Sequence, residues 1–342
     1  MAAIFVITRH TENYWHFSFY RSYLAVDLFF ILSGFVIAYA YDEKIKNGTI
    51  TFSKFFLIRL IRLYPVFLLS LFFSCVLLVL YHQIHYSNLT QILSVVAFTA
   101  LFIPSHMAGR DDLFALNGPY WSLFFELIAN LIYAAIRPLL TDSVLTSIVL
   151  LFGILITGVA YQQGNLSSGF EWGMESLIAG FSRSIFGVFL GLFLYRRQLQ
   201  FAQYFKNPNA AWLSFFAILI VLSSPDAGRL NWVVDVFCVA IVFPIVVLCA
   251  AQGKSAKLQG FLLMLGSASY PIYVLHLPVA AILAIPFHAV VEKFVPISGV
   301  VLVLVLVALS LAVEKYYDIP IRRRISDFLF KKSALSAVPA KS

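Results

Sequence analysis

The chain has 342 residues, of which 61% are hydrophobic and only 12% charged, and its mean hydropathy is +0.90. These values exclude an ordinary soluble domain and, with long uncharged runs, indicate a protein built from transmembrane helices. The net charge of +8 does not indicate nucleic acid binding, because the basic residues stand in short loops between apolar runs, as the positive-inside rule predicts. The three cysteines lie inside apolar runs without metal-ligand spacing, so no metal is expected.

The first apolar run, MAAIFVITRH, has about half the length of a membrane crossing. It lacks the basic leader of a signal peptide, so we predict the outer half of a first helix that ends at His10. A polar and aromatic loop follows, and residues 23–41 form the second span. This span carries Asp27 near its start. Because a carboxylate is costly to bury in hydrocarbon, Asp27 is a candidate functional residue.

A basic loop leads to the third span, predicted at residues 64–81. The loop ends in RLIRLYP, in which Arg59 and Arg62 lie three residues apart and therefore share one face of a helix. Two arginines so placed offer charge-assisted hydrogen bonds to a phosphate-rich group on the cytoplasmic side. Their alternative role is a simple anchor that sets membrane orientation.

Residues 92–104 are apolar but too few for a full crossing. Later spans are predicted near 120–137, 144–161, 176–195, 211–224, 232–251, 264–285 and 296–313. The basic residues of the intervening loops, among them Lys206, Lys254 and Lys257, all fall in the cytoplasm only if 92–104 does not cross.

We therefore predict an all-α integral membrane protein, a polytopic bundle of about ten transmembrane helices with a truncated first helix. Residues 92–104 are re-entrant or interfacial in this topology, and both termini are cytoplasmic. Residues 1–325 form the transmembrane domain, and residues 326–342 form a cytoplasmic basic tail.

This topology brings polar side chains from several helices toward one cavity near the outer face. They are His10, Asp27, Trp121, Ser122, Glu126, Arg183 and, at or beyond the middle of its span, His276. Alternative roles are open for each type. Asp27 and Glu126 are possible ion-pair partners of Arg183, Trp121 fits an interfacial aromatic belt, and a histidine at a helix end is often only a polar terminus.

Motifs in order along the chain resemble those of the acyltransferase 3 family of integral membrane O-acyltransferases. They are His10 at the end of the first helix, FFILSGF at 29–35, RLIRLYP at 59–65, Trp121-Ser122-Leu123 with Glu126, and Ser269-Tyr270 with Tyr273 and His276. The closing YYDIPIRRRI resembles the last basic turn of the family, so the likeness extends to about residue 325 without an added esterase-like domain. One departure is that the arginine expected about ten residues before His10 would precede Met1.

The resemblance implies transfer of an acyl group, most often acetyl from acetyl-CoA, to a hydroxyl of an envelope carbohydrate at a bacterial inner membrane. Arg59 and Arg62 would bind the phosphates of acyl-CoA. His10 would be a general base or a transient acyl carrier, and Asp27 or Glu126 would orient it.

Residues that would line the path of the acyl group or the sugar are Ser33, Gly34, Trp121, Ser122, Arg183, Tyr270, Tyr273 and His276. For Ser33 and Gly34, plain helix packing is the alternative. The acceptor stays open among O-antigen, exopolysaccharide and other glycans. Two other functions stay open as well, a transporter or flippase of a lipid-linked or small anionic substrate and an inactive truncated family member.

Overall fold

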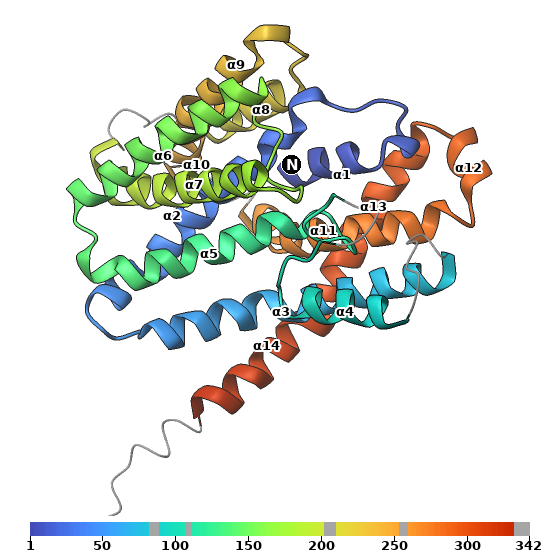
Figure 1. Cartoon of the computed structure of the whole chain (residues 1–342), viewed down its shortest axis with the longest axis horizontal. Coiled ribbons are helices and arrows are strands. Elements are labelled where there is room, and N and C mark those ends of the chain that lie inside the picture. The colour runs from blue at the N-terminus through green and yellow to red at the C-terminus, as the bar shows by residue number, and fades with distance from the viewer. Residues whose placement is uncertain (82–88, 107–110, 202–209, 253–258, 332–342) are drawn as a thin grey trace, which may run out of the picture.

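The computed structural model describes residues 1–81, 89–106, 111–201, 210–252 and 259–331. In chain order the helices are α1 (Ala2–His10), α2 (Ala25–Lys46), α3 (Phe52–Tyr81), α4 (Leu89–Ala100), α5 (Tyr120–Ile136), α6 (Asp142–Gln163), α7 (Met174–Phe201), α8 (Ala210–Ser223), α9 (Asn231–Phe237), α10 (Phe243–Gln252), α11 (Gln259–Ala284), α12 (His288–Lys293), α13 (Ile297–Val313) and α14 (Ile319–Ser326). The predicted all-α bundle is confirmed (Figure 1). Lys206, Lys254, Lys257 and residues 332–342 of the predicted tail lie outside the described residues.

Eight helical segments of the described chain are long and apolar enough to cross a membrane. They are formed by α2, α3, α5, α6, α7, the joined α9 and α10, α11, and the joined α13 and α14. The chain is thus a multi-pass membrane protein. Two further predicted spans are short helices, since α1 has 9 residues and α8 has 14, and their crossing stays a prediction.

Close packing of α2 against α7 forms the centre of the bundle. Gly34 of α2 lies so near the backbone of Val188 that a Cβ atom there would collide with it, and Gly191 of α7 faces the backbone of Ile31 equally closely. Small residues permit such an approach of two helices. The position of Gly34 therefore corresponds to the helix-packing alternative, away from any cavity wall.

The segment from α4 to α5 folds back into the bundle. Helix α4 has only 12 residues and packs on α3. The ring of Phe102, just after α4, lies 4.2 Å from that of Phe67 near the middle of α3, and Phe67 in turn packs on Tyr120 at the start of α5. A chain that reaches mid-helix depth and returns supports the re-entrant form of the prediction for residues 92–104.

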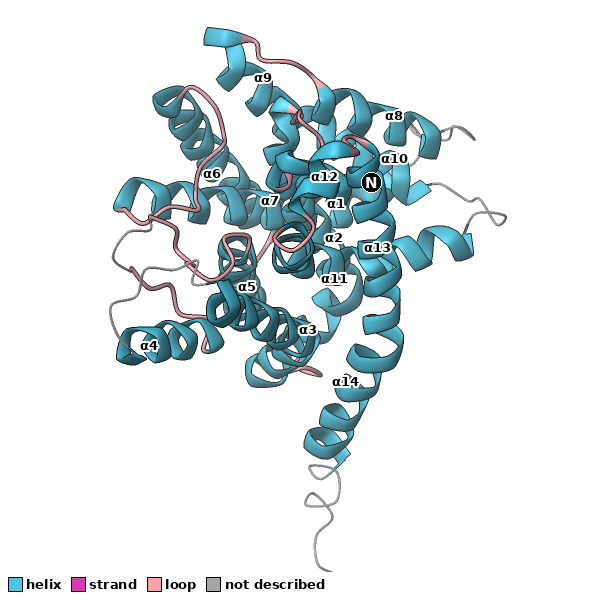
Figure 2. Cartoon of the chain, turned by 90° about the vertical axis from the view of Figure 1, so that its right-hand side faces the viewer, coloured by secondary structure: helices cyan, strands magenta, loops and turns pink. Residues whose placement is uncertain are grey.

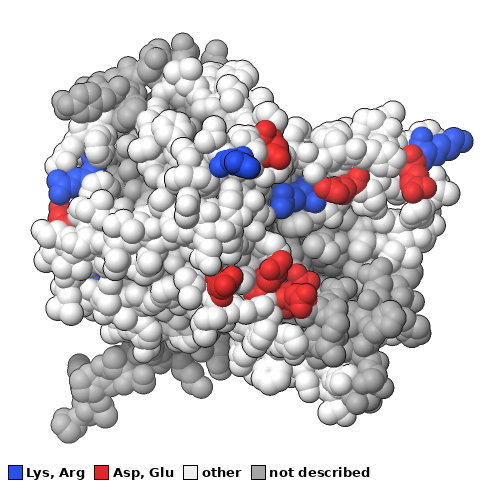
Figure 3. Space-filling model, turned by 45° about the horizontal axis from the view of Figure 1, so that its top comes forward, with Lys and Arg blue, Asp and Glu red and all other residues white. Residues whose placement is uncertain are grey.

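The C-terminal helix α14 projects beyond the bundle in both views (Figures 1 and 2). The surface seen in Figure 3 is largely uncharged, and its charged side chains stand in a few small groups. An uncharged exterior is what a lipid-facing bundle requires, because charged groups at the bilayer centre are costly.

Candidate active site

Two histidines from distant parts of the chain meet at the end of α1. His10 Nδ1 lies 3.0 Å from His276 Nε2, which comes from α11. His276 is fully buried, whereas His10 is exposed to the cavities on either side of it. The two rings stack with an interplanar angle of 20°.

The hydrogen bonds assign the tautomer of each ring. His276 Nδ1 lies 2.7 Å from the carbonyl oxygen of Tyr273, which can only accept, so Nδ1 of His276 carries the proton. In neutral His276, Nε2 is then an acceptor, and His10 Nδ1 must donate to it. Neutral His10 is therefore left with an unprotonated Nε2, the form that can take a proton or attack a carbonyl carbon.

A proline inside α11 frees a backbone carbonyl of this helix, and two neighbouring elements bond to it. Pro278 has no N–H, so the carbonyl of Val274 has no partner within the helix. Ser70 Oγ of α3 and Asn117 Nδ2 of the loop before α5 donate to this carbonyl at 2.5 and 3.0 Å. These bonds fix α11 against two other elements, two residues before His276.

A cavity of about 510 Å³ opens beside His10. Its wall includes Arg9, His10, Trp121, Ser168, Arg183 and Tyr273. His10, Trp121 and Arg183, three of the residues expected to converge, therefore line one cavity, together with Tyr273, which the resemblance placed on the acyl or sugar path. The volume falls within the usual range for small-molecule sites.

Asp27 lies behind this cavity and is paired with Arg183. The Arg183 Nε and Nη2 atoms lie 2.9 and 2.6 Å from the two carboxylate oxygens, and both side chains are buried. The guanidinium also faces the ring of Trp121 at 5.2 Å. Asp27 thus corresponds to the ion-pair alternative and positions the arginine in the cavity wall.

Glu126 lies one helical turn beyond Ser122 on α5 and bonds to side chains of α2 and α3 rather than to His10. Its Oε1 accepts from Arg59 Nη2 at 2.9 Å and from Ser33 Oγ at 2.5 Å. In the described part of the chain, no hydrogen bond or ion pair joins His10 to Asp27 or Glu126. We expected Asp27 or Glu126 to orient His10, but both carboxylates are paired with arginines. His276 is the side chain that contacts His10 Nδ1 instead.

Arg62 is paired with a different carboxylate from Arg59. It lies 3.3 Å from Asp318, which also binds Arg322 at 2.8 Å, and it faces the ring of Tyr270 at 5.4 Å. The Arg62 side chain is 35% exposed and that of Arg59 only 13%. Arg62 therefore keeps more exposed donors for a ligand, while Arg59 is more buried and binds Glu126 through Nη2, with its Nε unpaired.

A hydrogen bond between α11 and α5 connects the histidine pair to the helix that carries Glu126. Tyr273 Oη lies 2.5 Å from Ser122 Oγ, one turn from Glu126, while the Tyr273 carbonyl holds His276. Predicted residues thus run through the bundle from the histidine pair to the arginines.

Comparison with known proteins identifies the family of the chain. The sequence model of the acyltransferase domain, that of the acyltransferase 3 family, matches residues 1–314. The chain belongs to the acyltransferase 3 family. It is also 40% identical over 146 residues to "Protein 2 in picA locus" of Rhizobium radiobacter, an alignment that covers 39% of this chain and 76% of that protein. No solved structure matches significantly.

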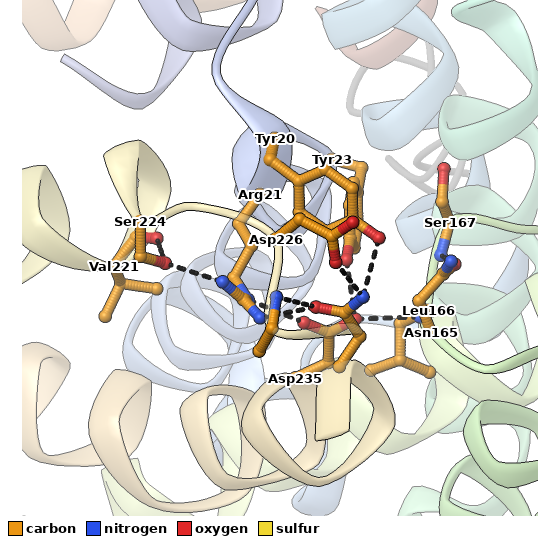
Figure 4. Close-up of polar contacts among 12 residues, drawn as sticks. Tyr20, Arg21, Tyr23, Asn165, Leu166, Ser167, Val221, Ser224, Asp226 and Asp235 are labelled. Carbon is orange, nitrogen blue, oxygen red and sulfur yellow. Dashed lines mark hydrogen bonds and ion pairs between the residues drawn. The ribbon is translucent and has the colours of Figure 1, made fainter. Parts of the chain in front are cut away.

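A second polar network lies beside the larger cavity of this acyltransferase 3 domain, and the sequence did not reveal it (Figure 4). Fully buried Asp235 of α9 accepts from Arg21 Nε at 3.2 Å, Tyr23 Oη at 2.7 Å and the Leu166 backbone N–H at 3.0 Å. Tyr23 and Ser167 also contact Arg9, by a 5.2 Å stacking distance and a 3.1 Å hydrogen bond. Asp235 therefore joins two walls of the cavity.

Other residues missed from the sequence are Asn117 and Ser168. Both are buried in the cavity wall of the acyltransferase 3 domain, and Asn117 Oδ1 and Ser168 Oγ have no hydrogen-bond partner. Buried polar atoms without partners are rare, and these two are enclosed by protein atoms rather than open to the cavity. The only sequence signal was the position of Asn117 in NGPYW, directly before the Trp121 motif.

Proposed function

We propose that this acyltransferase moves an acyl group, most often acetyl, from cytoplasmic acyl-CoA to a hydroxyl of an envelope or exported carbohydrate in a bacterial inner membrane. The observation that carries the proposal is the tautomer pattern of the histidine pair. His276 holds His10 with its Nε2 lone pair free beside a polar cavity.

As a general base, His10 Nε2 takes the proton of the acceptor hydroxyl while the hydroxyl oxygen bonds to the acyl carbon. The thioester C–S bond breaks, and the coenzyme A thiolate leaves and recovers the proton from the imidazolium. His276 Nε2 accepts from Nδ1 throughout, which stabilises the protonated ring. In the alternative role, Nε2 attacks the acyl carbon and the C–S bond breaks, which releases the coenzyme A thiolate. The sugar hydroxyl then attacks the acyl carbon, the C–N bond to the histidine breaks, and the hydroxyl proton passes to the freed Nε2.

The 510 Å³ cavity is the proposed acceptor site. Arg9, Glu12 and Arg183 line it and supply charged hydrogen-bonding groups. A sugar offers many hydroxyls that can donate to the carboxylate and accept from the guanidinium groups. An apolar ligand would displace water from these charged groups without replacing its hydrogen bonds.

For the donor, Arg59 and Arg62 remain the proposed phosphate ligands, with Arg62 the more available of the two. Asp318 holds Arg62 and Arg322 close together, so Arg322 is a further candidate for the same phosphates. Charge-assisted hydrogen bonds from two arginines suit a nucleotide phosphate.

The decisive experiment incubates membranes containing the protein with acyl-labelled acetyl-CoA and a glycan fraction from the producing cells. We expect glycan labelling with the wild type and loss of it with His10→Ala. His16→Asn, which changes an exposed histidine of the same outer loop whose φ of 54° asparagine tolerates, is the control. Equal labelling by the wild type and His10→Ala would remove His10 from the mechanism.

A single-turnover reaction without acceptor distinguishes the two roles of His10. Label on the protein, lost in His10→Ala, indicates the acyl carrier, and its absence indicates the general base. Mass spectrometry of surface glycans with and without the gene then identifies the acceptor.

A further inference from the structure

A second, smaller cavity of about 290 Å³ lies next to His10. Its apolar wall comes from the end of α11 and the residue after it: Leu277, Ala280, Ala281, Ala284 and Ile285. His10 and Leu277 line both cavities, so they separate the two spaces. A group held at the His10 imidazole can therefore extend into either cavity.

The two buried polar side chains that line the smaller cavity, Thr11 and Tyr14, already have partners. Thr11 Oγ1 donates to the Ile7 carbonyl at 2.7 Å and accepts from Trp15 Nε1 at 3.1 Å. Tyr14 Oη donates to the Ala280 carbonyl at 2.8 Å. Burial raises the pKa of the Tyr14 phenol to about 12, so it stays a neutral donor in this bond.

The two cavities thus differ in what they can bind. The larger one is lined by the charged side chains of Arg9, Glu12 and Arg183, while the deep wall of the smaller one is alkyl. Asn13 and His288, which complete the lining, are exposed residues. A sugar in the smaller cavity would lose hydrogen bonds to water without replacement, whereas an alkyl chain would gain apolar contacts.

We infer that the smaller cavity binds the alkyl part of the acyl group during transfer and limits its length. The inference rests on the proposed function, since it requires the acyl carbon to lie at His10. A volume of about 290 Å³ is roughly ten times the share of one water molecule in the liquid, so it exceeds the needs of an acetyl methyl group. The cavity therefore fits short chains longer than acetyl.

Ala281 and Ala284 are the residues that set the size of this cavity. Both present only a methyl group to it, and Ala284 is buried. Leucine has a helix propensity close to that of alanine, so Ala281→Leu and Ala284→Leu fill the cavity without weakening α11. Ala280 is left unchanged because the Tyr14 phenol bonds directly to its backbone carbonyl.

The test measures kcat/KM of the full-length protein with acetyl-, propionyl-, butyryl- and hexanoyl-CoA at a fixed acceptor concentration. We expect the wild type to use propionyl and butyryl groups. Ala281→Leu with Ala284→Leu should lower butyryl transfer relative to acetyl transfer by about 10–200-fold, the usual effect of a methylene in an apolar pocket. Ala308→Leu, the same change at an exposed site on neighbouring α13, should leave the profile unchanged.

Several outcomes would overturn the inference. They are a wild type that transfers only acetyl, a chain-length profile that the double variant does not change, and a uniform rise of acceptor KM at every chain length. The last would assign the cavity to the acceptor. If the double variant does not fold, Ala281→Val alone supplies the same comparison with a smaller shift. Absence of transfer from every acyl-CoA by the wild type would instead contradict the proposed function.

Discussion

The phenol of Tyr23 donates a 2.7 Å hydrogen bond to Asp235, while the ring of the same tyrosine faces the Arg9 guanidinium at 5.2 Å. One side chain therefore links a buried ion pair to the wall of the proposed acceptor cavity. Tyr133 forms an equivalent 2.7 Å bond to Asp42, which is also paired with arginine, but it does not line that cavity. The two tyrosines form a matched pair for experiment.

Tyr23→Phe should raise the KM for the acceptor several-fold and leave the KM for acyl-CoA unchanged. The reason is that the ring which positions Arg9 is no longer tied to Asp235. Tyr133→Phe removes a bond of the same kind, worth about 1.5–3 kcal/mol when the acceptor is charged, and should lower thermal stability without changing either KM. Identical kinetic effects of the two variants would show that the Asp235 network has only a general structural role.

His276→Leu should lower kcat by about 10²–10⁴-fold, because His10 loses the acceptor that sets its tautomer. His276→Gln should retain more activity, since its side-chain oxygen can accept from His10 Nδ1. Initial rates with saturating acyl-CoA and acceptor measure both. The hypothesis fails if leucine and glutamine at 276 are equally active.

Asp27→Asn should destabilise the protein by about 3–5 kcal/mol, because it leaves the Arg183 charge buried without compensation. Asp27→Asn combined with Arg183→Gln should recover part of this loss. Thermal unfolding in detergent of both single variants and the double variant measures the coupling. Additive losses would contradict a direct interaction between these groups.

Arg62→Ala should raise the KM for acyl-CoA, because Arg62 keeps exposed donors beside Tyr270. Arg197→Ala is the control: its side chain is 32% exposed and also paired with an aspartate, Asp142. Arg59→Ala should in addition lower kcat, since it leaves Glu126 without its cation. If neither Arg62→Ala nor Arg59→Ala changes the KM for acyl-CoA, or if Arg197→Ala raises it equally, the phosphate-binding assignment is wrong.

The fold class could be predicted from the sequence because the length of an apolar run is a local property. A helix needs about 20 apolar residues to cross the bilayer whatever its neighbours are. The same reasoning identified residues 92–104 as too short. The predicted topology also placed His10, Trp121 and Arg183 near one depth, and the structure brings these three to one cavity.

Depth alone did not identify which side chains bind to each other. His10 and His276 are 266 positions apart, and Asp27 and Arg183 are 156 apart. Whether two such residues touch depends on how each helix is rotated about its axis and how closely it packs, which hydrophobic pattern does not specify when a helix is apolar on most of its surface.

The sequence by itself determined a multi-pass helical membrane protein of the acyltransferase 3 family and the residue types of its site. Only the tertiary structure decided that a histidine, and not a carboxylate, is the partner of His10, and that His10 lies between a polar and an apolar cavity. The physical reason is that burial in hydrocarbon acts on each segment separately. Hydrogen bonds and cavities arise only where segments meet.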